Sequence, residues 1–290
     1  MLCYSQIQEI VTFLQHYLES EMSQEELLKE VEAQRDPHLS GCCRLSSRKR
    51  IVEMIKKIQV ILYPGYYSYN DMNVKEALES LENDLKLEFD SALCFAGRNI
   101  STSKEKVQQF LDRLPYLLQT LNTDLQAIYD GDPAAKSKAE VLLCYPGFYA
   151  ISIYRIAHEL YELGIPNIPR IMSEYAHEKT GIDIHSGAKI GPYFCIDHGT
   201  GIVVGETAVI GHHVKLYQGV TIGAKSFEKD ENGNPKKGGK RHPNIGDYVT
   251  IYANATILGG DTYIGSRSII GGNVWLVSSV KENSKVYFNG

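Results

Sequence analysis

The chain has no long hydrophobic run of the kind that crosses a membrane. No uninterrupted apolar stretch in its 290 residues approaches the roughly 20 residues that a bilayer span requires. The N-terminal segment MLCYSQIQEIVTF lacks the basic region and the small-residue cleavage site of a secretory signal peptide. We therefore expect a cytoplasmic protein that does not enter a membrane.

An excess of positive charge is also missing. The formal net charge is −5, which argues against a nucleic acid or an anionic membrane as partner. The six cysteines include no Cys-x-x-Cys pair and no framework spacing, so we expect reduced thiols. The apolar fraction of 43% and the charged fraction of 22% are typical of a soluble globular protein that buries a substantial core.

Residues 1–180 show the pattern of helices. Apolar residues recur at helical spacing over 7–18 and again over 27–31. The segments Ser23-Gln-Glu-Glu26 and Thr102-Ser-Lys-Glu105 have the form of capping boxes, and each predicts the start of a helix. Further helices are expected over 46–62, 74–95, 103–121, 137–143, 147–163 and 167–180. No spacing typical of a ligand site occurs here, so we interpret this half as a helical scaffold or oligomerisation domain.

After Thr180 the apolar repeat changes to six residues. Neither a helix nor a half-buried strand has this period. A hexapeptide repeat is typical of a parallel β-helix, in which each aliphatic residue points inward and stacks on its equivalents in neighbouring coils. Because about 18 residues make one coil, we expect roughly four coils. The aliphatic residues that fit are Ile184, Ile190, Ile196, Val204, Ile210, Leu216, Ile222, Ile245, Ile251, Ile257, Ile264, Ile270 and Leu276.

The predicted fold class is therefore α+β. Residues 1–180 form an N-terminal all-α domain, and residues 181–290 form a C-terminal left-handed parallel β-helix of hexapeptide repeats. The repeat is interrupted between Ile196 and Val204, and again over 223–244, where a polar, glycine-rich segment predicts a loop extruded from the β-helix. We expect function at these interruptions, because the repeat itself serves only packing.

The first interruption contains His198. Asp183 lies at the start of the same coil, so one turn of the coil brings the two residues close together around a corner. An aspartate that accepts a hydrogen bond from one imidazole nitrogen raises the basicity of the other nitrogen. His198 is then suited to remove a proton from an alcohol. The alternative for a single histidine is a hydrogen bond that serves packing alone.

Charged residues predict two clamps for a zwitterion. Arg241 and His242, at the end of the loop, offer a guanidinium group and a second donor to a carboxylate. Asp132 and Asp197 offer carboxylates to an ammonium group. A base with these two clamps describes an amino acid that carries a hydroxyl group. The basic run of Lys236, Lys237 and Lys240 either meets phosphates or is a solvated part of the loop.

Four segments of the β-helix carry a resemblance to a known family. They are GIDIHSGAKIG from Gly181, IDHGTGIVVGETA from Ile196, QGVTIG from Gln218 and KRHP from Lys240. With Asp132-Pro-Ala and YPGFY from Tyr145, they make residues 130 to 280 resemble serine O-acetyltransferase. The resemblance implies transfer of an acetyl group from acetyl-CoA to the hydroxyl of L-serine. The products are O-acetyl-L-serine and CoA, in the first step of cysteine biosynthesis.

The resemblance also implies a role for each candidate residue. His198 would be the general base and Asp183 its partner. Because none of the six cysteines lies in a recognisable activated setting, we also expect direct transfer without an acyl-enzyme. The serine ammonium group would bind Asp132 and Asp197, and its carboxylate would bind Arg241 and His242, with His185 also at the site. Coenzyme A would bind Gly223, Ala224 and Lys240. Family members place their active sites between neighbouring β-helices of a homotrimer, and often pair trimers into hexamers.

The chain departs from the family pattern in two places. Its extended loop carries an additional acidic and basic segment from Phe227 to Lys240. Many members also continue into a tail that ends in isoleucine and docks into the next enzyme of the pathway, O-acetylserine sulfhydrylase. This chain stops at Gly290 without that tail, so a complex with that partner stays open.

Two other functions also stay open on the sequence. A related hexapeptide acetyltransferase would use another hydroxylated acceptor, such as a sugar or an antibiotic, although the two clamps favour a zwitterion. A metal-dependent carbonic anhydrase on the same coil would need three histidines that converge on zinc. The β-helix histidines at 185, 198, 212, 213 and 242 contain no His-x4-His pair, so we expect no metal.

Overall fold

The computed structural model describes residues 8, 11–12, 23–35, 45–226, 229–236 and 238–288. The chain divides into two compact units, residues 1–44 and residues 45–290. In the first unit, helix α2 (Gln24–Ala33) begins at a capping box of Ser23 and Glu26, which confirms that prediction. The helix expected over 7–18 lies largely outside the described residues.

The second unit begins with helices close to those predicted. They are α3 (Arg48–Leu62), α4 (Val74–Phe95), α5 (Ser103–Gly131), α6 (Lys138–Cys144), α7 (Pro146–Glu162) and α8 (Ile168–Thr180). Helix α5 continues to Gly131 rather than ending at residue 121. Leu125 and Ile128 extend its buried face, and Asp124, which interrupts the apolar pattern, is buried in an ion pair with Arg155.

The predicted capping box at Thr102 is wrong. A short 3₁₀ helix, η2 (Ile100–Thr102), precedes α5, so Thr102 already has helical backbone angles and its side chain does not cap α5. The Thr102 hydroxyl instead donates to the carbonyl of Asn99. The Asn99 side chain accepts from the backbone N–H of Ser101, so the helical backbone starts at this earlier cap.

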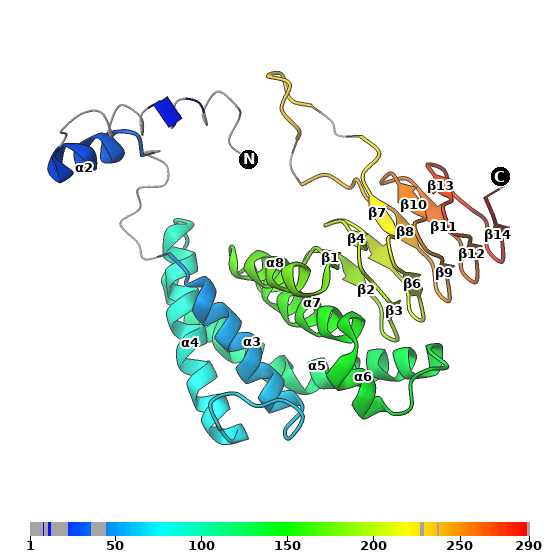
Figure 1. The fold of residues 1–290 in the computed structure, drawn as a ribbon, viewed down its shortest axis with the longest axis horizontal. Helices are drawn as coiled ribbons and strands as arrows, with labels where there is room; N and C mark the ends of the chain where they lie inside the picture. The colour runs from blue at the N-terminus through cyan, green and yellow to red at the C-terminus, as the bar shows by residue number, and fades with distance from the viewer. Residues whose placement is uncertain are drawn as a thin grey trace. The chain divides into compact units, whose positions relative to one another are not determined.

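Short parallel strands then wind into a β-helix, at the right of Figure 1. They form three sheets with the orders β1-β4-β7-β10-β13, β2-β5-β8-β11 and β3-β6-β9-β12-β14. The predicted α+β class and the parallel β-helix are thereby confirmed. The strands are β1 (Asp183–Ile184), β2 (Lys189–Ile190), β3 (Cys195–Asp197), β4 (Val203–Val204), β5 (Val209–Ile210), β6 (Lys215–Tyr217), β7 (Thr221–Gly223), β8 (Asn244–Ile245), β9 (Thr250–Ile251), β10 (Thr256–Leu258), β11 (Tyr263–Ile264), β12 (Ile269–Ile270), β13 (Trp275–Leu276) and β14 (Lys285–Val286).

The six-residue repeat forms the core of the β-helix. Every predicted aliphatic residue lies in a strand, and all of them except Leu276 are buried. Strand pairing stacks them in columns; Ile196, Leu216, Ile251 and Ile270 make one such column. The sheets give about five turns rather than the four expected, because Val286 extends this column outside the six-residue period.

The predicted loop leaves the β-helix between β7 and β8. Its described residues from Lys225 to Lys240 are exposed, and the yellow segment in Figure 1 projects away from the strands. An isolated antiparallel bridge joins Lys229 to Pro235 near its tip. The prediction of an extruded loop is therefore confirmed.

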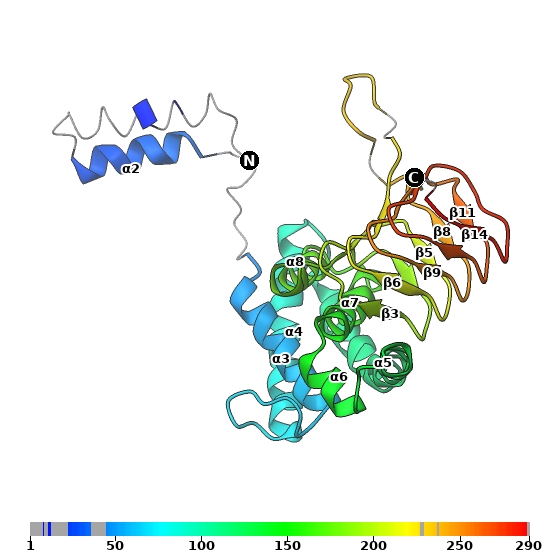
Figure 2. The ribbon, with the colours of Figure 1, turned by 45° about the vertical axis from the view of Figure 1, so that its right-hand side comes forward.

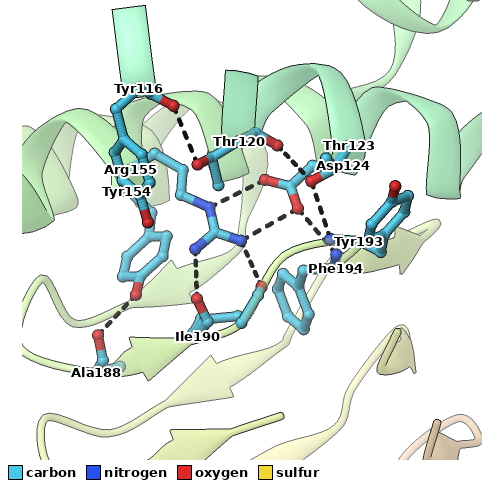
Figure 3. Close-up of polar contacts among 11 residues, drawn as sticks. Tyr116, Thr120, Thr123, Asp124, Tyr154, Arg155, Ala188, Ile190, Tyr193 and Phe194 are labelled. Carbon is cyan, nitrogen blue, oxygen red and sulfur yellow. Dashed lines mark hydrogen bonds and ion pairs between the residues drawn. The ribbon is translucent and has the colours of Figure 1, made fainter. Parts of the chain in front are cut away.

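A buried ion pair joins the helices to the first coil of the β-helix (Figure 3). Asp124 on α5 accepts from Nε of Arg155 at 2.9 Å and from the backbone N–H of Phe194 at 2.8 Å. Arg155 on α7 also donates to the carbonyls of Ile190 and Gly191. These bonds hold the turn that leads into β3, which lies beside α5 and α7 (Figure 2).

Helix and β-helix meet at Gly181, whose left-handed backbone ends α8 directly before β1. The division into a domain of residues 1–180 and one of residues 181–290 stays a prediction. Cys144 and Cys195 are free, as expected for these two thiols. Within the described ranges, no helix is long and apolar enough to cross a membrane.

Candidate functional site

The interrupted corner after β3 turns His198 outward. His198, Gly199 and Gly201 all have positive φ angles, of 59°, 96° and 83°. A Cβ atom on Gly199 would lie 2.5 Å from Cδ1 of Ile182, so only glycine fits that position. The inserted residues therefore form a tight bend packed on the coil, and the His198 side chain above it is 74% exposed.

The carboxylate that faces the His198 imidazole belongs to Asp197. Its Oδ1 atom lies 3.8 Å from Nε2 of His198. Asp183 sits across the same corner on β1, where its backbone N–H donates to the carbonyl of Ile202 at 2.9 Å. In the part of the chain that the structure describes, no hydrogen bond or ion pair joins Asp183 to His198, so their partnership stays a prediction.

Asp132 caps the C-terminal end of α5 beside this corner. Its Oδ2 accepts from the Tyr145 hydroxyl at 2.6 Å, and its Oδ1 accepts from the backbone N–H of Ala134 at 2.8 Å. These two hydrogen bonds lower the pKa of Asp132, and the hydrogen bond to Asp132 raises the pKa of Tyr145 to about 12. Asp132 is therefore ionised at neutral pH and holds a fixed orientation.

Lys215 on β6 links the two aspartates. Its Nζ lies 2.8 Å from Oδ2 of Asp197 and donates to the carbonyl of Gly131, directly before Asp132, at 2.8 Å. Burial alone would lower the pKa of Lys215, but its hydrogen bond to Asp197 raises it above the ordinary value. One corner therefore gathers His198, Asp197, Asp132, Tyr145 and Lys215, and we call this set the ammonium corner.

Arg241 and His242 lie at a different corner, after β4. The Arg241 guanidinium forms an ion pair of 2.5 Å with Glu206. Nδ1 of His242 accepts from the backbone N–H of Thr207 at 3.0 Å, so its proton is on Nε2, which can donate. Burial and the neighbouring cations lower the pKa of His242 to about 4, which keeps the ring neutral. We call Glu206, Thr207, Arg241 and His242 the carboxylate corner.

His185 joins the carboxylate corner rather than His198. It lines a cleft of about 500 Å³ together with Glu206 and Tyr161. The Tyr161 hydroxyl donates to Glu206 at 3.2 Å, and the Tyr161 ring meets the His185 ring edge-on. Burial lowers the pKa of His185, so the ring is neutral near pH 7.

The residues predicted to bind coenzyme A lie where the loop leaves and rejoins the β-helix. Gly223 ends β7 and its carbonyl accepts from the N–H of Gly259, and Ala224 follows it into the loop. Nζ of Lys240 donates to the carbonyl of Thr207 and to Asn244. A cleft of about 520 Å³ opens here, and its basic lining consists of Lys225, Lys236, Lys240 and Arg241.

The structure thus divides the predicted site between two corners of one coil. His198, Asp197 and Asp132 come together, as do Arg241, His242 and His185. The two corners lie at opposite ends of β4, and no hydrogen bond or ion pair among the described residues joins them. Tyr145, Lys215 and Glu206 were not predicted from the sequence, although Tyr145 and Glu206 lie inside the segments that carry the resemblance.

The histidines of the β-helix do not converge. His212 pairs with Asp247 at 3.2 Å, and His213 stacks between Tyr193 and Tyr248. Over the described residues, no group of three or more His, Cys, Asp and Glu side chains is placed to hold a metal ion. The zinc-dependent alternative therefore lacks a ligand set in the described structure.

Comparison with known proteins gives consistent matches. The family model described as "Serine acetyltransferase, N-terminal" matches residues 74–152. The protein named "Serine acetyltransferase, plasmid" from Synechococcus elongatus is 55% identical over 258 residues, which is 83% of this chain and 81% of that protein. The crystal structure of Entamoeba histolytica serine acetyltransferase 1 in complex with L-cysteine has a TM-score of 0.73 and 38% identity, over 89% of this chain and 94% of that chain. The serine acetyltransferase of Brucella abortus in complex with coenzyme A has a TM-score of 0.57 and 31% identity, over 72% of this chain and 80% of that chain.

Proposed function

The chain belongs to the serine acetyltransferase family, and from that premise we propose that it moves the acetyl group of acetyl-CoA directly to the hydroxyl of L-serine. The observation that supports this proposal most strongly is the ammonium corner. Two acidic side chains, Asp132 with its lowered pKa and Asp197 in its ion pair with Lys215, lie beside an exposed imidazole that carries no competing hydrogen bond to another side chain among the described residues.

The reaction needs one proton acceptor and no covalent intermediate. The His198 imidazole takes the proton of the serine hydroxyl as the serine oxygen attacks the thioester carbonyl. The carbon–sulfur bond then breaks, and the imidazolium passes this proton to the leaving CoA thiolate, which leaves as the thiol. Cys195 is the cysteine next to this corner, but burial raises the pKa of its thiol to about 12, which argues against an acetyl-cysteine intermediate.

The serine carboxylate would bind the carboxylate corner of a second copy of the chain. Within one chain, Arg241 lies at the opposite end of β4 from His198, and the His198 side chain is 74% exposed. A general base works best in a closed site from which water is excluded. We therefore propose a homotrimer or a dimer of trimers, in which one copy supplies His198 and its neighbour supplies Arg241 and the neutral donor His242.

Coenzyme A would bind at the base of the loop. The cleft beside Gly223 is lined by Lys225, Lys236, Lys240 and Arg241, and Asp261 is the one acidic residue among its described lining. Such a basic lining suits the phosphates of a nucleotide carrier. The complex of the Brucella abortus relative with coenzyme A supports the choice of carrier.

The test is thiol release from acetyl-CoA with L-serine, L-homoserine, ethanolamine and a sugar offered separately. L-serine should be strongly preferred over ethanolamine, because ethanolamine lacks the carboxylate that Arg241 and His242 would bind. L-homoserine should be poorer than L-serine, because its hydroxyl oxygen overshoots His198 by one methylene. Equal rates with ethanolamine and L-serine would contradict the assignment of the carboxylate corner and of serine itself.

A further inference from the structure

We infer that Lys215 is a positioning residue. It holds Asp132 and Asp197 in place so that they form one ammonium-binding site of net charge −1. The inference rests on the proposed function, because the ammonium group in question is that of serine. Lys215 does not touch the substrate. It acts through the two carboxylates that do.

The Lys215 ammonium group has three partners. Nζ contacts Oδ2 of Asp197 and the carbonyl of Gly131, each at 2.8 Å, and lies 4.5 Å from the centre of the Tyr217 ring. The side chain is only 17% exposed. A cation that is so fully paired and shielded is a permanent part of the corner, and an incoming ammonium group would not displace it.

The bond to Gly131 places Asp132. The last turns of α5 are tied to the β-helix at Asp124, which accepts from the N–H of Phe194, and again at Gly131, which accepts from Lys215. Asp132 follows the second tie directly. Lys215 therefore contacts both the end of α5, through Gly131, and β3, through Asp197. These two contacts fix the separation between Asp132 and Asp197.

The bond from Lys215 to Asp197 gives the two oxygens of that carboxylate different neighbours. Lys215 occupies Oδ2, while Oδ1 lies on the side of the His198 imidazole. An ammonium group that binds Oδ1 then lies next to the base, which is where serine must present its hydroxyl. Lys215 also offsets one of the two negative charges, so the corner carries −1 and complements a single ammonium group.

The experiment compares Lys215→Met with Lys285→Met, an exposed lysine on β14 of the same sheet. Lys215→Met should raise the KM for L-serine about tenfold, the effect of losing one hydrogen bond to a charged group, while the KM for acetyl-CoA stays unchanged. Lys285→Met should change neither constant. Lys215→Arg keeps the charge and should recover part of the loss.

A second acceptor separates positioning from general damage. 3-Hydroxypropanoate is serine without its ammonium group, so its kcat/KM should be nearly the same in wild type and Lys215→Met. The preference for L-serine over 3-hydroxypropanoate should therefore shrink about tenfold in the variant. A variant that loses activity equally on both acceptors, or binds L-serine more tightly, would overturn the inference.

Failure of the inference is distinguishable from failure of the proposed function. Wild-type enzyme that acetylates L-serine, together with unchanged constants for Lys215→Met, would refute the role of Lys215 alone. Wild-type enzyme that does not acetylate L-serine would refute the proposed function. Combining Lys215→Met with Asp197→Asn adds a check, because the part of the effect that acts through Asp197 should disappear once that residue has lost its charge, and only the part that acts through Gly131 and Asp132 should remain.

Discussion

Replacing Asp124 with asparagine removes one charge from the buried link between the helices and the β-helix (Figure 3). The Asp124 side chain is fully buried and that of Arg155 is 7% exposed. Asparagine keeps the shape of the side chain. Its NH2 group, however, replaces one of the two carboxylate oxygens that accept from Arg155 and from the N–H of Phe194. The variant leaves a buried guanidinium without its counter-charge and sets its own amide hydrogens against these donors.

The expected cost follows from this geometry. Breaking a buried ion pair by neutralising one partner costs about 3–5 kcal/mol, because the remaining charge stays buried. Arg155 keeps its bonds to the carbonyls of Ile190 and Gly191, which places the loss nearer the lower end. In a domain of this size, that free energy corresponds to a fall in Tm of roughly 10 °C.

The assay is urea-induced unfolding of wild type and variant, read as the midpoint and the slope m. The matched control is Glu159→Gln, which breaks the more exposed pair between Arg113 on α5 and Glu159 on α7. That control should lose no more than about 1 kcal/mol. If Asp124→Asn were no more destabilising than Glu159→Gln, the buried pair would not be what holds the helices to the first coil.

Two further predictions concern histidines. His198→Ala should lose about 10²–10⁴ in turnover at saturating substrates without a change in thermal unfolding, because it removes the proton acceptor; near-normal turnover would exclude His198 as the base. Because the pKa of His242 is about 4 in the native protein and 6.5 in its ordinary state, the unfolded chain binds more protons between these values and stability falls as the pH drops through that window. His242→Gln should therefore reduce the difference in unfolding free energy between pH 7 and pH 5 by about 2 kcal/mol, and an unchanged difference would contradict the lowered pKa.

The β-helix could be predicted from the sequence because its core depends on local information. Each inward position, such as Ile210 or Ile251, needs only an aliphatic residue six positions from the last one, and strand pairing then follows from the coil. The loop and the bend at Gly199 were visible as departures from that period. The missed strand at Val286 lies outside the six-residue period, so no pattern marked it.

Contacts between distant elements could not be predicted in this way. The end of α5 was misjudged because Asp124 looks like a surface residue until Arg155 is placed beside it. Lys215 reads as an exposed position on a strand, and only the fold brings it to Gly131, 84 residues earlier in the chain. The placement of Arg241 and His198 at different corners was equally hidden, because it depends on the position of β4 between those corners.

A mixing experiment tests the central claim, that His198 of one copy and Arg241 of another build one serine site. His198→Ala and Arg241→Ala are each expected to be nearly inactive at low serine concentration. When both variants are co-expressed at a one-to-one ratio and all oligomers, mixed and unmixed, are purified together, about a quarter of the sites should combine an intact His198 with an intact Arg241. We predict recovery of about that fraction of wild-type activity in thiol release from acetyl-CoA with L-serine. Mixed oligomers with no more activity than either variant alone would contradict the account.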